Sequence, residues 1–405
     1  MTSSSTWPSS CRRVVIVAPC VPEASGGARA VENYVPMFEA LGAHVDVVSL
    51  YPGTAGRPVG FVPRVVVRRR ALHRGPVVRG GSAAWRRAWL LPVVAFKRLD
   101  WTYAMWRYRR LMSSFGSDTL VVFTHVTPLA VLHESGFTWA PSGPLVIGQH
   151  HAPFVSVEED PALGRRIARE FAGVDAFVAL TDDDAARFAE VLPVPCYALP
   201  NPARPLSAVE EATIDSGGAR PRTAVALARL SPVKQLDLMI RAFVRATTAP
   251  GLQDWRLRIF GDGSERAALE RVIEAAGVGD RVELMGEVDD VGPALDAAAV
   301  NLLTSRYEGF GMSALEAAQR GVPTVAFDCS VGVGTLVTEL HGRLVRPAGD
   351  EDAFVDVLRT VLVDEVGLAE SGALARAASG RYHPDEVGRQ WAGVVADLLE
   401  RRSRR

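Results

Sequence analysis

Short, β-branched runs alternate with helical patterns along most of this chain, and this alternation restricts its fold more than any other feature. The run RRVVIVAPC is followed by a small-residue loop, a helix-like stretch over 28–41 and the apolar run HVDVVSL. The same order recurs through TLVVFTHV, PLVIGQHH, DAFVALT and CYALPN. Units of this kind build parallel sheets that are buried on both faces. The sequence therefore predicts an α/β domain in the first half of the chain.

The stretch 200–221 interrupts the alternation. It is rich in Pro, Gly, Ser and acidic residues, and we interpret it as an irregular interdomain linker. The alternation resumes with TAVALARL, WRLRIFGDG, RVELMGEV, VNLLTSR and PTVAFD. The 405 residues also exceed what one hydrophobic core usually holds. We predict an N-terminal α/β domain over 1–205, a C-terminal α/β domain over 206–383 and a closing amphipathic helix over 384–405.

Two sheets joined by one linker form a ligand crevice where the carboxyl ends of their strands face each other. Gly26 and Gly27 follow the first strand, where backbone amides can approach a phosphate, although a flexible turn is an equal alternative. His150 and His151 end the run PLVIGQHH. Histidine at such a place can bind a hydroxyl or relay a proton, and a plain surface role is the alternative.

Two cations follow the first strand of the second half, at Arg229 and Lys234. Their spacing suits a diphosphate, because arginine can grip two oxygens while lysine acts as a point charge. Two solvated surface cations are the alternative. Gly261 follows the next strand, in a turn where Asp262 could equally cap the following helix.

The acidic run TDDDA at 181–185 is typical of a metal site at first sight. It follows a strand and precedes a helical pattern, so Thr181 can cap the helix while the carboxylates complement its positive end. We interpret it as a cap and predict no metal site.

The stretch TSRYEGFGMSALEA carries the most specific pattern. Glu308 precedes the turn Gly309, Phe310 and Gly311, and Glu316 lies about one turn into the predicted helix. Amides at a helix N-terminus can meet an anion, and two carboxylates can accept from hydroxyl groups. This combination favours a polyhydroxylated, anionic ligand such as a sugar nucleotide.

Taken together, these segments resemble the retaining sugar-nucleotide glycosyltransferases of family 4. The matching parts are the early GG loop, ARLSPVKQLDLMIRAF, GDGSER, SRYEGFGMSALEA and GVPTVAFD. The resemblance implies the α/β GT-B fold, in which two Rossmann-like domains face each other across a cleft and a C-terminal helix packs back on the body. It implies transfer of a hexose or N-acetylhexosamine from a nucleotide sugar, which we expect to be UDP-linked, with retention of configuration.

The resemblance also implies roles for the donor residues. Arg229 and Lys234 would hold the diphosphate and stabilise the leaving group. Glu308 would orient the sugar, Glu316 would accept from the ribose, and the amides of 309–311 would meet the sugar or diphosphate. No metal and no cofactor beyond the nucleotide-sugar co-substrate is implied.

His151 matches the histidine that lies near the transferred sugar in this family, with His150 as its substitute. The implied catalytic set is Glu308, His151, Arg229 and Lys234. The chain departs from the family pattern at Gly334 and Thr335, where relatives often carry Arg and Glu. This departure affects the loop that would hold the base and the phosphates.

The wording of the TSRYEGFGMSALEA stretch resembles the branch that decorates poly(polyol phosphate) chains such as teichoic acids. Between positions 64 and 110 the chain has thirteen Lys or Arg residues and one acidic residue, interleaved with Trp85, Trp89, Trp101 and Trp106. Such a segment attracts an anionic membrane or polymer. A solvated helical face with buried tryptophans is the alternative, and no nucleic-acid motif accompanies the charge.

These observations favour an anionic cell-envelope acceptor, either a phosphopolyol polymer or a lipid-linked glycan. A glycosyltransferase acting on a small soluble product is one alternative, and a non-catalytic sugar-nucleotide or membrane-binding protein is another. The apolar run at 14–21 is too short for a membrane span and lacks a signal-peptide layout. We therefore expect a cytoplasmic protein that contacts the inner face of the plasma membrane peripherally.

Overall fold

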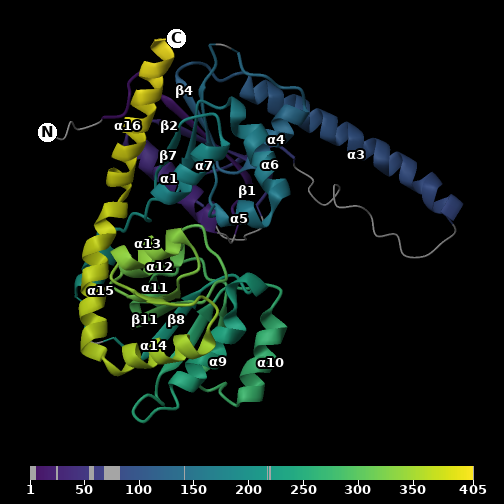
Figure 1. The fold of residues 1–405 in the computed structure, drawn as a ribbon. Helices are drawn as coiled ribbons and strands as arrows, with labels where there is room; N and C mark the ends of the chain where they lie inside the picture. The colour runs from purple at the N-terminus through teal and green to yellow at the C-terminus, as the bar shows by residue number, and fades with distance from the viewer. Residues whose placement is uncertain are drawn as a thin grey trace.

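The computed structural model describes residues 6–23, 26–53, 59–67, 83–140, 142–216, 218 and 220–404, and within 83–97 it describes the backbone alone. Two parallel sheets with flanking helices lie one above the other in Figure 1. The predicted α/β GT-B class, with two sheets facing across a cleft, is confirmed by this arrangement and by the structural comparison reported below.

Within the described residues, seven parallel strands form the N-terminal sheet, in the order β3-β2-β1-β4-β5-β6-β7. They are β1 (Arg13–Val21), β2 (His44–Pro52), β3 (Arg64–Val65), β4 (Thr119–Phe123), β5 (Leu145–Gln149), β6 (Ala176–Ala179) and β7 (Cys196–Ala198). The helices are α1 (Gly26–Ala40), α3 (Ala83–Met112), α4 (Val126–Glu134), α5 (Val155–Glu159), α6 (Pro161–Glu170), η1 (Phe171–Gly173) and α7 (Asp182–Val191). Every residue of β4, β5 and β6 is buried, as expected for a parallel sheet between helical layers.

The second sheet has six strands in the part of the chain that the structure describes, in the order β10-β9-β8-β11-β12-β13. They are β8 (Thr223–Leu227), β9 (Arg256–Phe260), β10 (Val282–Gly286), β11 (Val300–Leu303), β12 (Thr324–Phe327) and β13 (Arg343–Val345). The helices are η2 (Pro232–Lys234), α9 (Leu236–Ala246), α10 (Arg266–Ala276), α11 (Gly292–Asp296), α12 (Met312–Gln319), α13 (Val331–Glu339), α14 (Glu351–Val363), α15 (Glu365–Ser379) and η3 (Gly380–Tyr382). No element was predicted over 351–379, where α14 and α15 lie.

The last helix returns to the N-terminal half. Helix α16 (Pro384–Ser403) follows α15 and runs up beside the upper sheet in Figure 1. Its Trp391 is fully buried and packs edge-on against Tyr34 and Phe38 of α1, with ring centroids 5.7 and 5.5 Å apart. The predicted amphipathic closing helix thus contributes to the core of the N-terminal domain.

The prediction of an irregular linker over 200–221 is wrong in its middle. Helix α8 (Ala208–Asp215) lies there, although none of its residues is buried. A capping box starts it, in which Ser207 accepts from the Glu210 amide and the Glu210 carboxylate accepts from the Ser207 amide. Because polar caps and ion pairs hold this helix, it has no apolar periodicity for the sequence to reveal.

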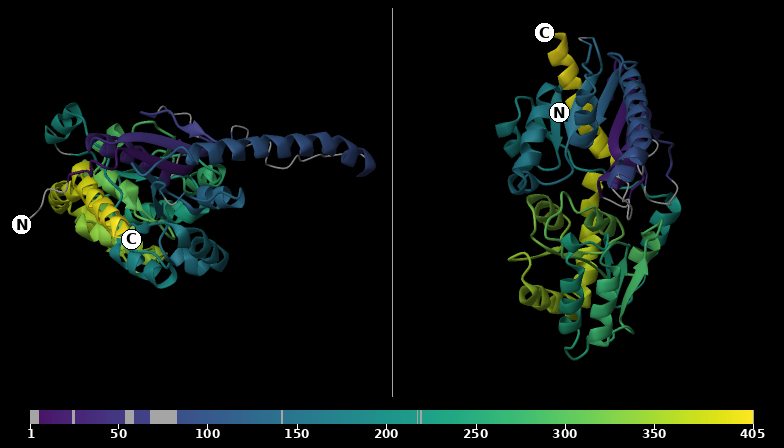
Figure 2. Two further views of the ribbon diagram at one scale, coloured as in Figure 1. Left: turned by 90° about the horizontal axis from the view of Figure 1, so that it is seen from above. Right: turned by 90° about the vertical axis from the view of Figure 1, so that its right-hand side faces the viewer.

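Helix α3 leaves the body. Figure 1 shows its N-terminal end far from either sheet, and Figure 2 shows the same projection from above. Its C-terminal half packs on the N-terminal core through Ala104, Met105, Tyr108 and Met112. No helix in the described part of the chain is both long enough and apolar enough to cross a bilayer.

Candidate functional site

A cavity of about 310 Å³ lies between the carboxyl ends of the two sheets. Its lining includes all eleven residues of the predicted catalytic and donor-binding set, but not the substitute His150: Gly26, Gly27, His151, Arg229, Lys234, Gly261, Glu308, Gly309, Phe310, Gly311 and Glu316. The size falls at the lower end of the range of small-ligand sites. The residues come from both halves of the chain, so the cavity exists only because the two sheets face each other.

Glu308 is held from several sides. Its carboxylate forms an ion pair with Lys234 and accepts from the Ser305 hydroxyl at 2.8 Å. Its backbone carbonyl accepts from the Ser330 hydroxyl at 2.7 Å, at the start of α13. The Thr304 hydroxyl, which follows β11, donates to the Lys234 carbonyl at 3.0 Å. The lysine and the carboxylate are therefore positioned as one unit.

Gly309 lies where the two halves of the chain touch. A Cβ at this position would stand 1.7 Å from the His151 carbonyl oxygen, so only glycine fits against that backbone. On the opposite side, a Cβ at Gly332 of α13 would stand 2.3 Å from the Gly309 carbonyl oxygen. The turn before α12 is thus enclosed between the N-terminal domain and α13.

The rest of this turn starts α12. Gly311 has φ +90°, which favours glycine, and immediately precedes the first residue of the helix. The Phe310 ring is 5% exposed and packs edge-on against Tyr382, with centroids 5.7 Å apart. The Phe310 side chain therefore anchors the loop.

Glu316 forms an ion pair across the cleft. Its Oε1 lies 3.3 Å from Nη1 of Arg29, which belongs to α1 of the N-terminal domain. The Glu316 side chain is 11% exposed. Arg29 was not predicted from the sequence, although a cation two positions after Gly27 is a signal that could have been used beside a predicted anion site.

Arg229 is exposed at the cavity, unlike the ion-paired Lys234. Its loop is set by Gly261, whose φ is +136° and whose Cβ would stand 2.0 Å from the Ala228 carbonyl oxygen. The Leu230 amide also donates to the Asp262 carbonyl at 3.0 Å. Gly261 therefore allows two strand-end loops to pack closely and supports the position of Arg229.

The two histidines lie in different environments. His151 lines the cavity, whereas His150 is 4% exposed and lies between the rings of His125 and Phe188, at centroid distances of 5.9 and 6.2 Å. Burial, with a further contribution from His125, lowers the pKa of His151 to about 4 and that of His150 to about 3. Both imidazoles are neutral at neutral pH, and only His151 faces the cavity.

The acidic run is a helix cap, as predicted. The Thr181 hydroxyl accepts from the Asp184 amide at 3.1 Å, and the Asp184 carboxylate accepts from the Phe154 amide at 2.8 Å. Elsewhere in the described ranges, no cluster of His, Cys, Asp and Glu has the arrangement of a metal site.

Gly334, where the sequence departs from the family pattern, has little room for a larger side chain. A Cβ there would stand 2.6 Å from the Asp328 carboxylate, which forms an ion pair with Arg346 at 2.5 Å. A long cationic side chain at 334 would therefore displace Asp328.

The arrangement combines the exposed Arg229, the ion pairs Lys234–Glu308 and Arg29–Glu316, and the 309–311 turn before α12. Cations suit phosphate oxygens, and carboxylates accept from sugar hydroxyls. The cavity can thus recognise a phosphorylated, polyhydroxylated ligand.

Comparison with known families agrees with this chemistry. Residues 221–364 match the family model described as "Glycosyl transferases group 1". The matched range includes Arg229, Lys234, Glu308 and Glu316. The C-terminal half therefore carries a glycosyltransferase group 1 domain.

Three individual proteins are informative. The chain is 31% identical over 295 residues to an exopolysaccharide phosphotransferase of Streptomyces coelicolor, a match that covers 73% of this chain and 30% of that protein. It is 26% identical over 182 residues to the poly(glycerol-phosphate) alpha-glucosyltransferase of Bacillus subtilis, covering 45% and 27%. The structure of Anabaena HepE in complex with UDP-glucose superposes with a TM-score of 0.65 at 16% identity, covering 95% and 99%. The chain thus spans less than a third of either curated relative, while its fold matches HepE over almost the whole length.

Proposed function

We propose that this protein is a retaining, metal-independent glycosyltransferase of family 4 that transfers a hexose or N-acetylhexosamine from a UDP-sugar. The observation that carries the proposal is the interdomain cavity, in which all eleven predicted residues converge. The group 1 domain and the UDP-glucose complex of HepE, a protein of the same fold, support it.

Arg229 and Lys234 bind the diphosphate in this proposal. Arg229 is open to the cavity. A bound phosphate replaces Glu308 as the partner of Lys234. Both cations stabilise the charge that develops on the leaving UDP, which is a preorganised electrostatic effect.

Glu308 then accepts from hydroxyls of the sugar, and Glu316 accepts from the ribose. Neutral His151 donates to or accepts from a sugar hydroxyl without adding charge. The acceptor hydroxyl attacks the anomeric carbon from the face that the diphosphate leaves, and the departing phosphate oxygen takes its proton. Configuration is retained in this route without a protein nucleophile.

The acceptor in this proposal is a hydroxyl of an anionic cell-envelope glycan, either a phosphopolyol polymer or a lipid-linked chain, met at the cytoplasmic face of the membrane. The names of the two curated relatives, an exopolysaccharide enzyme and a poly(glycerol-phosphate) glucosyltransferase, support an anionic polymer. The basic segment over 64–110 supports it independently. Arg68 to Arg79 and the side chains of Trp85 and Trp89 lie outside the described residues.

A thermal-shift screen of UDP-, ADP- and GDP-sugars tests donor binding. A donor at about a hundred times its Kd stabilises the folded protein by about 2.7 kcal/mol, which raises Tm by a few degrees. We expect this shift with a UDP-sugar, its loss in Lys234→Ala and its persistence in Arg271→Gln, an exposed arginine on α10. No shift with any nucleotide sugar would overturn the donor assignment. Product masses then separate transfer of a sugar from transfer of a sugar phosphate.

A further inference from the structure

The C-terminal half of α3 has two opposite faces. Successive residues of a helix are about 100° apart, so residues spaced by three and four share a face. Trp101, Met105, Tyr108 and Met112 follow this spacing and contact the N-terminal core. Leu99, Tyr103, Trp106 and Arg110 follow it on the other side of the helix. We call these last four residues, with Arg107 beside them, the α3 face.

The apolar members of the α3 face are exposed to an unusual degree. Leu99 is 70% exposed, Tyr103 60% and Trp106 52%. The two aromatic rings stack with centroids 5.9 Å apart. They also border a groove of about 820 Å³ whose other wall includes Pro52 and Pro63. Contiguous exposed apolar surface of this kind marks a binding site more often than chance.

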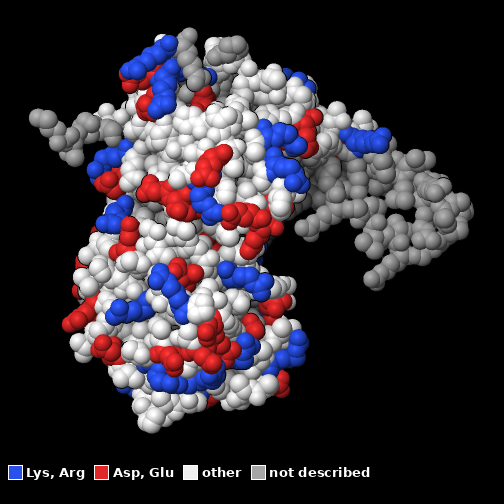
Figure 3. Space-filling view, in the orientation of Figure 1, with Lys and Arg blue, Asp and Glu red and all other residues white. Residues whose placement is uncertain are grey.

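Two cations lie over these rings. The Arg107 guanidinium lies 6.0 Å from the centroid of Tyr103, and that of Arg110 lies 5.5 Å from the centroid of Trp106. Neither arginine forms an ion pair with a carboxylate among the described residues. Figure 3 shows blue side chains, of Lys or Arg, where the projection seen in Figure 1 leaves the body. The α3 face is therefore both apolar and positively charged.

Charge and side-chain type distinguish between three possible occupants. A second copy of the chain would bring like charges together, which opposes self-association through this face. A soluble anionic polymer would satisfy the arginines but would leave Leu99 in water. Val62, which is 92% exposed and next in sequence to Pro63 of the groove, would gain nothing either. An anionic bilayer accommodates both features, because aliphatic and Trp side chains enter the headgroup boundary while arginines meet the phosphates.

We propose that the α3 face docks on an anionic lipid surface, with α3 lying along the headgroup region. An anionic lipid surface at α3 is where the protein would meet the acceptor of the proposed function. Only this link to the acceptor rests on the proposed function. The test of this docking needs no turnover, so its failure is distinguishable from a failure of the donor assignment.

Flotation of the full chain with vesicles tests the proposal. We expect binding to vesicles of phosphatidylglycerol and phosphatidylcholine, and weak binding to phosphatidylcholine alone. The pair Arg107→Gln and Arg110→Gln should lower the partition constant roughly twenty-five-fold, at about fivefold for each cation. The pair Leu99→Ser and Trp106→Ser should lower it at least about tenfold through lost apolar burial.

A matched control changes two equally exposed apolar residues elsewhere, Val363→Ser and Val366→Ser, which are 65% and 71% exposed. This control should bind vesicles as the unchanged chain does. Two outcomes would overturn the proposal. One is vesicle binding that ignores the Leu99 and Trp106 changes and is competed fully by a soluble polyanion, which indicates a polymer site. The other is a dimer in sedimentation velocity that Trp106→Ser dissociates, which indicates a second copy.

Discussion

Arg29 and Glu316 lie far apart in the sequence, yet their side chains form an ion pair across the cleft. The pair fixes a nearly buried carboxylate at the place where the proposed function puts the ribose. We predict that Arg29→Ala raises KM for the donor about tenfold, which corresponds to about 1.4 kcal/mol of binding. kcat should change less, because the arginine orients a binding group and not the reacting atoms.

Steady-state kinetics with the best UDP-sugar checks this prediction, with Arg29→Lys as the conservative variant. The lysine should recover part of the lost affinity, since it keeps the charge but not the planar fork. Equal KM values for the unchanged protein and Arg29→Ala would show that the ion pair does not position Glu316.

Gly309 has no side chain to take part in the chemistry, but its lack of a Cβ lets the two domains approach each other. A Cβ there would overlap the His151 carbonyl, so Gly309→Ala should hold the two domains apart by a fraction of an ångström or more. Small displacements of this kind cost about a hundredfold in rate. We predict such a loss in kcat/KM with little change in Tm, measured by UDP release and calorimetry. Gly393→Ala, where a Cβ would meet open space, is the control and should retain full activity.

Residue positions after strands could be predicted, but contacts across the cleft could not. Glu308, Lys234 and Gly261 follow strands of one parallel sheet, so the rule for carboxyl ends identified them. Arg29 was missed because its partner lies in the other domain. His150 and His151 directly follow β5, and the sequence does not say which of the two side chains faces the cleft.

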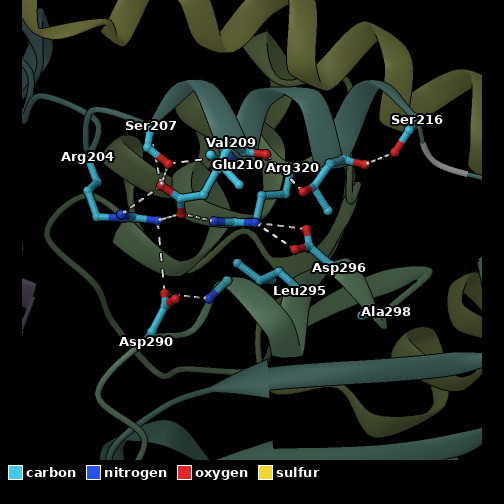
Figure 4. Close-up of polar contacts among 12 residues, drawn as sticks. Arg204, Ser207, Val209, Glu210, Ser216, Asp290, Leu295, Asp296, Ala298 and Arg320 are labelled. Carbon is cyan, nitrogen blue, oxygen red and sulfur yellow. Dashed lines mark hydrogen bonds and ion pairs between the residues drawn. The ribbon is translucent and has the colours of Figure 1, made fainter.

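At the scale of elements, α8 is held by the ion network in Figure 4. Glu210 pairs with Arg204 and with Arg320, whose side chain is 4% exposed and also pairs with Asp296 at 2.8 Å. Burial by itself would raise the pKa of Glu210, but Arg204 and the Ser207 amide and hydroxyl outweigh it and lower the pKa to about 2. The carboxylate therefore stabilises the folded state wherever it is charged.

We predict that Glu210→Gln lowers the free energy of unfolding by about 2 kcal/mol at pH 7, because it leaves a buried guanidinium with one partner fewer. The folded pKa lies below the ordinary value of 4.5, so the stabilisation is complete above about pH 4.5 and is lost as the pH falls toward 2. Urea denaturation at pH 7 and at pH 3 measures the loss of unfolding free energy and its decrease at low pH. Glu211→Gln, an exposed neighbour, should change neither, and a difference for Glu210→Gln that is constant with pH would contradict the account.

Elements with an apolar signature were predictable, and α8 was not. A strand such as TLVVF is predictable from its continuous apolar run, and the closing helix with Trp391 is predictable from its helical apolar spacing. Helix α8 buries nothing and depends on Arg204 and Arg320, which are distant in the sequence. The C-terminal half of α3 is a third case. Apolar residues lie on two opposite faces, so the sequence shows no single apolar stripe with helical spacing.

At the scale of the whole molecule, the two sheets are joined three times: by the segment around α8, by α16 returning to the upper domain, and by the contacts of Gly309 and Glu316 in the cleft. The sequence predicted two domains and one linker. It also predicted that the closing helix packs back on the body, but not that α16 packs on Tyr34 and Phe38, because that contact depends on tertiary proximity.

In the proposed function, the cleft between the sheets activates a UDP-sugar. The most direct test is the rate of UDP release from a panel of UDP-sugars, with and without a phosphopolyol acceptor, by the unchanged chain, Lys234→Ala and the surface control Arg271→Gln. We predict saturable release from at least one UDP-sugar, a loss of about a hundredfold or more in Lys234→Ala and no change in the control. Release that is equal in the unchanged chain and Lys234→Ala would contradict it.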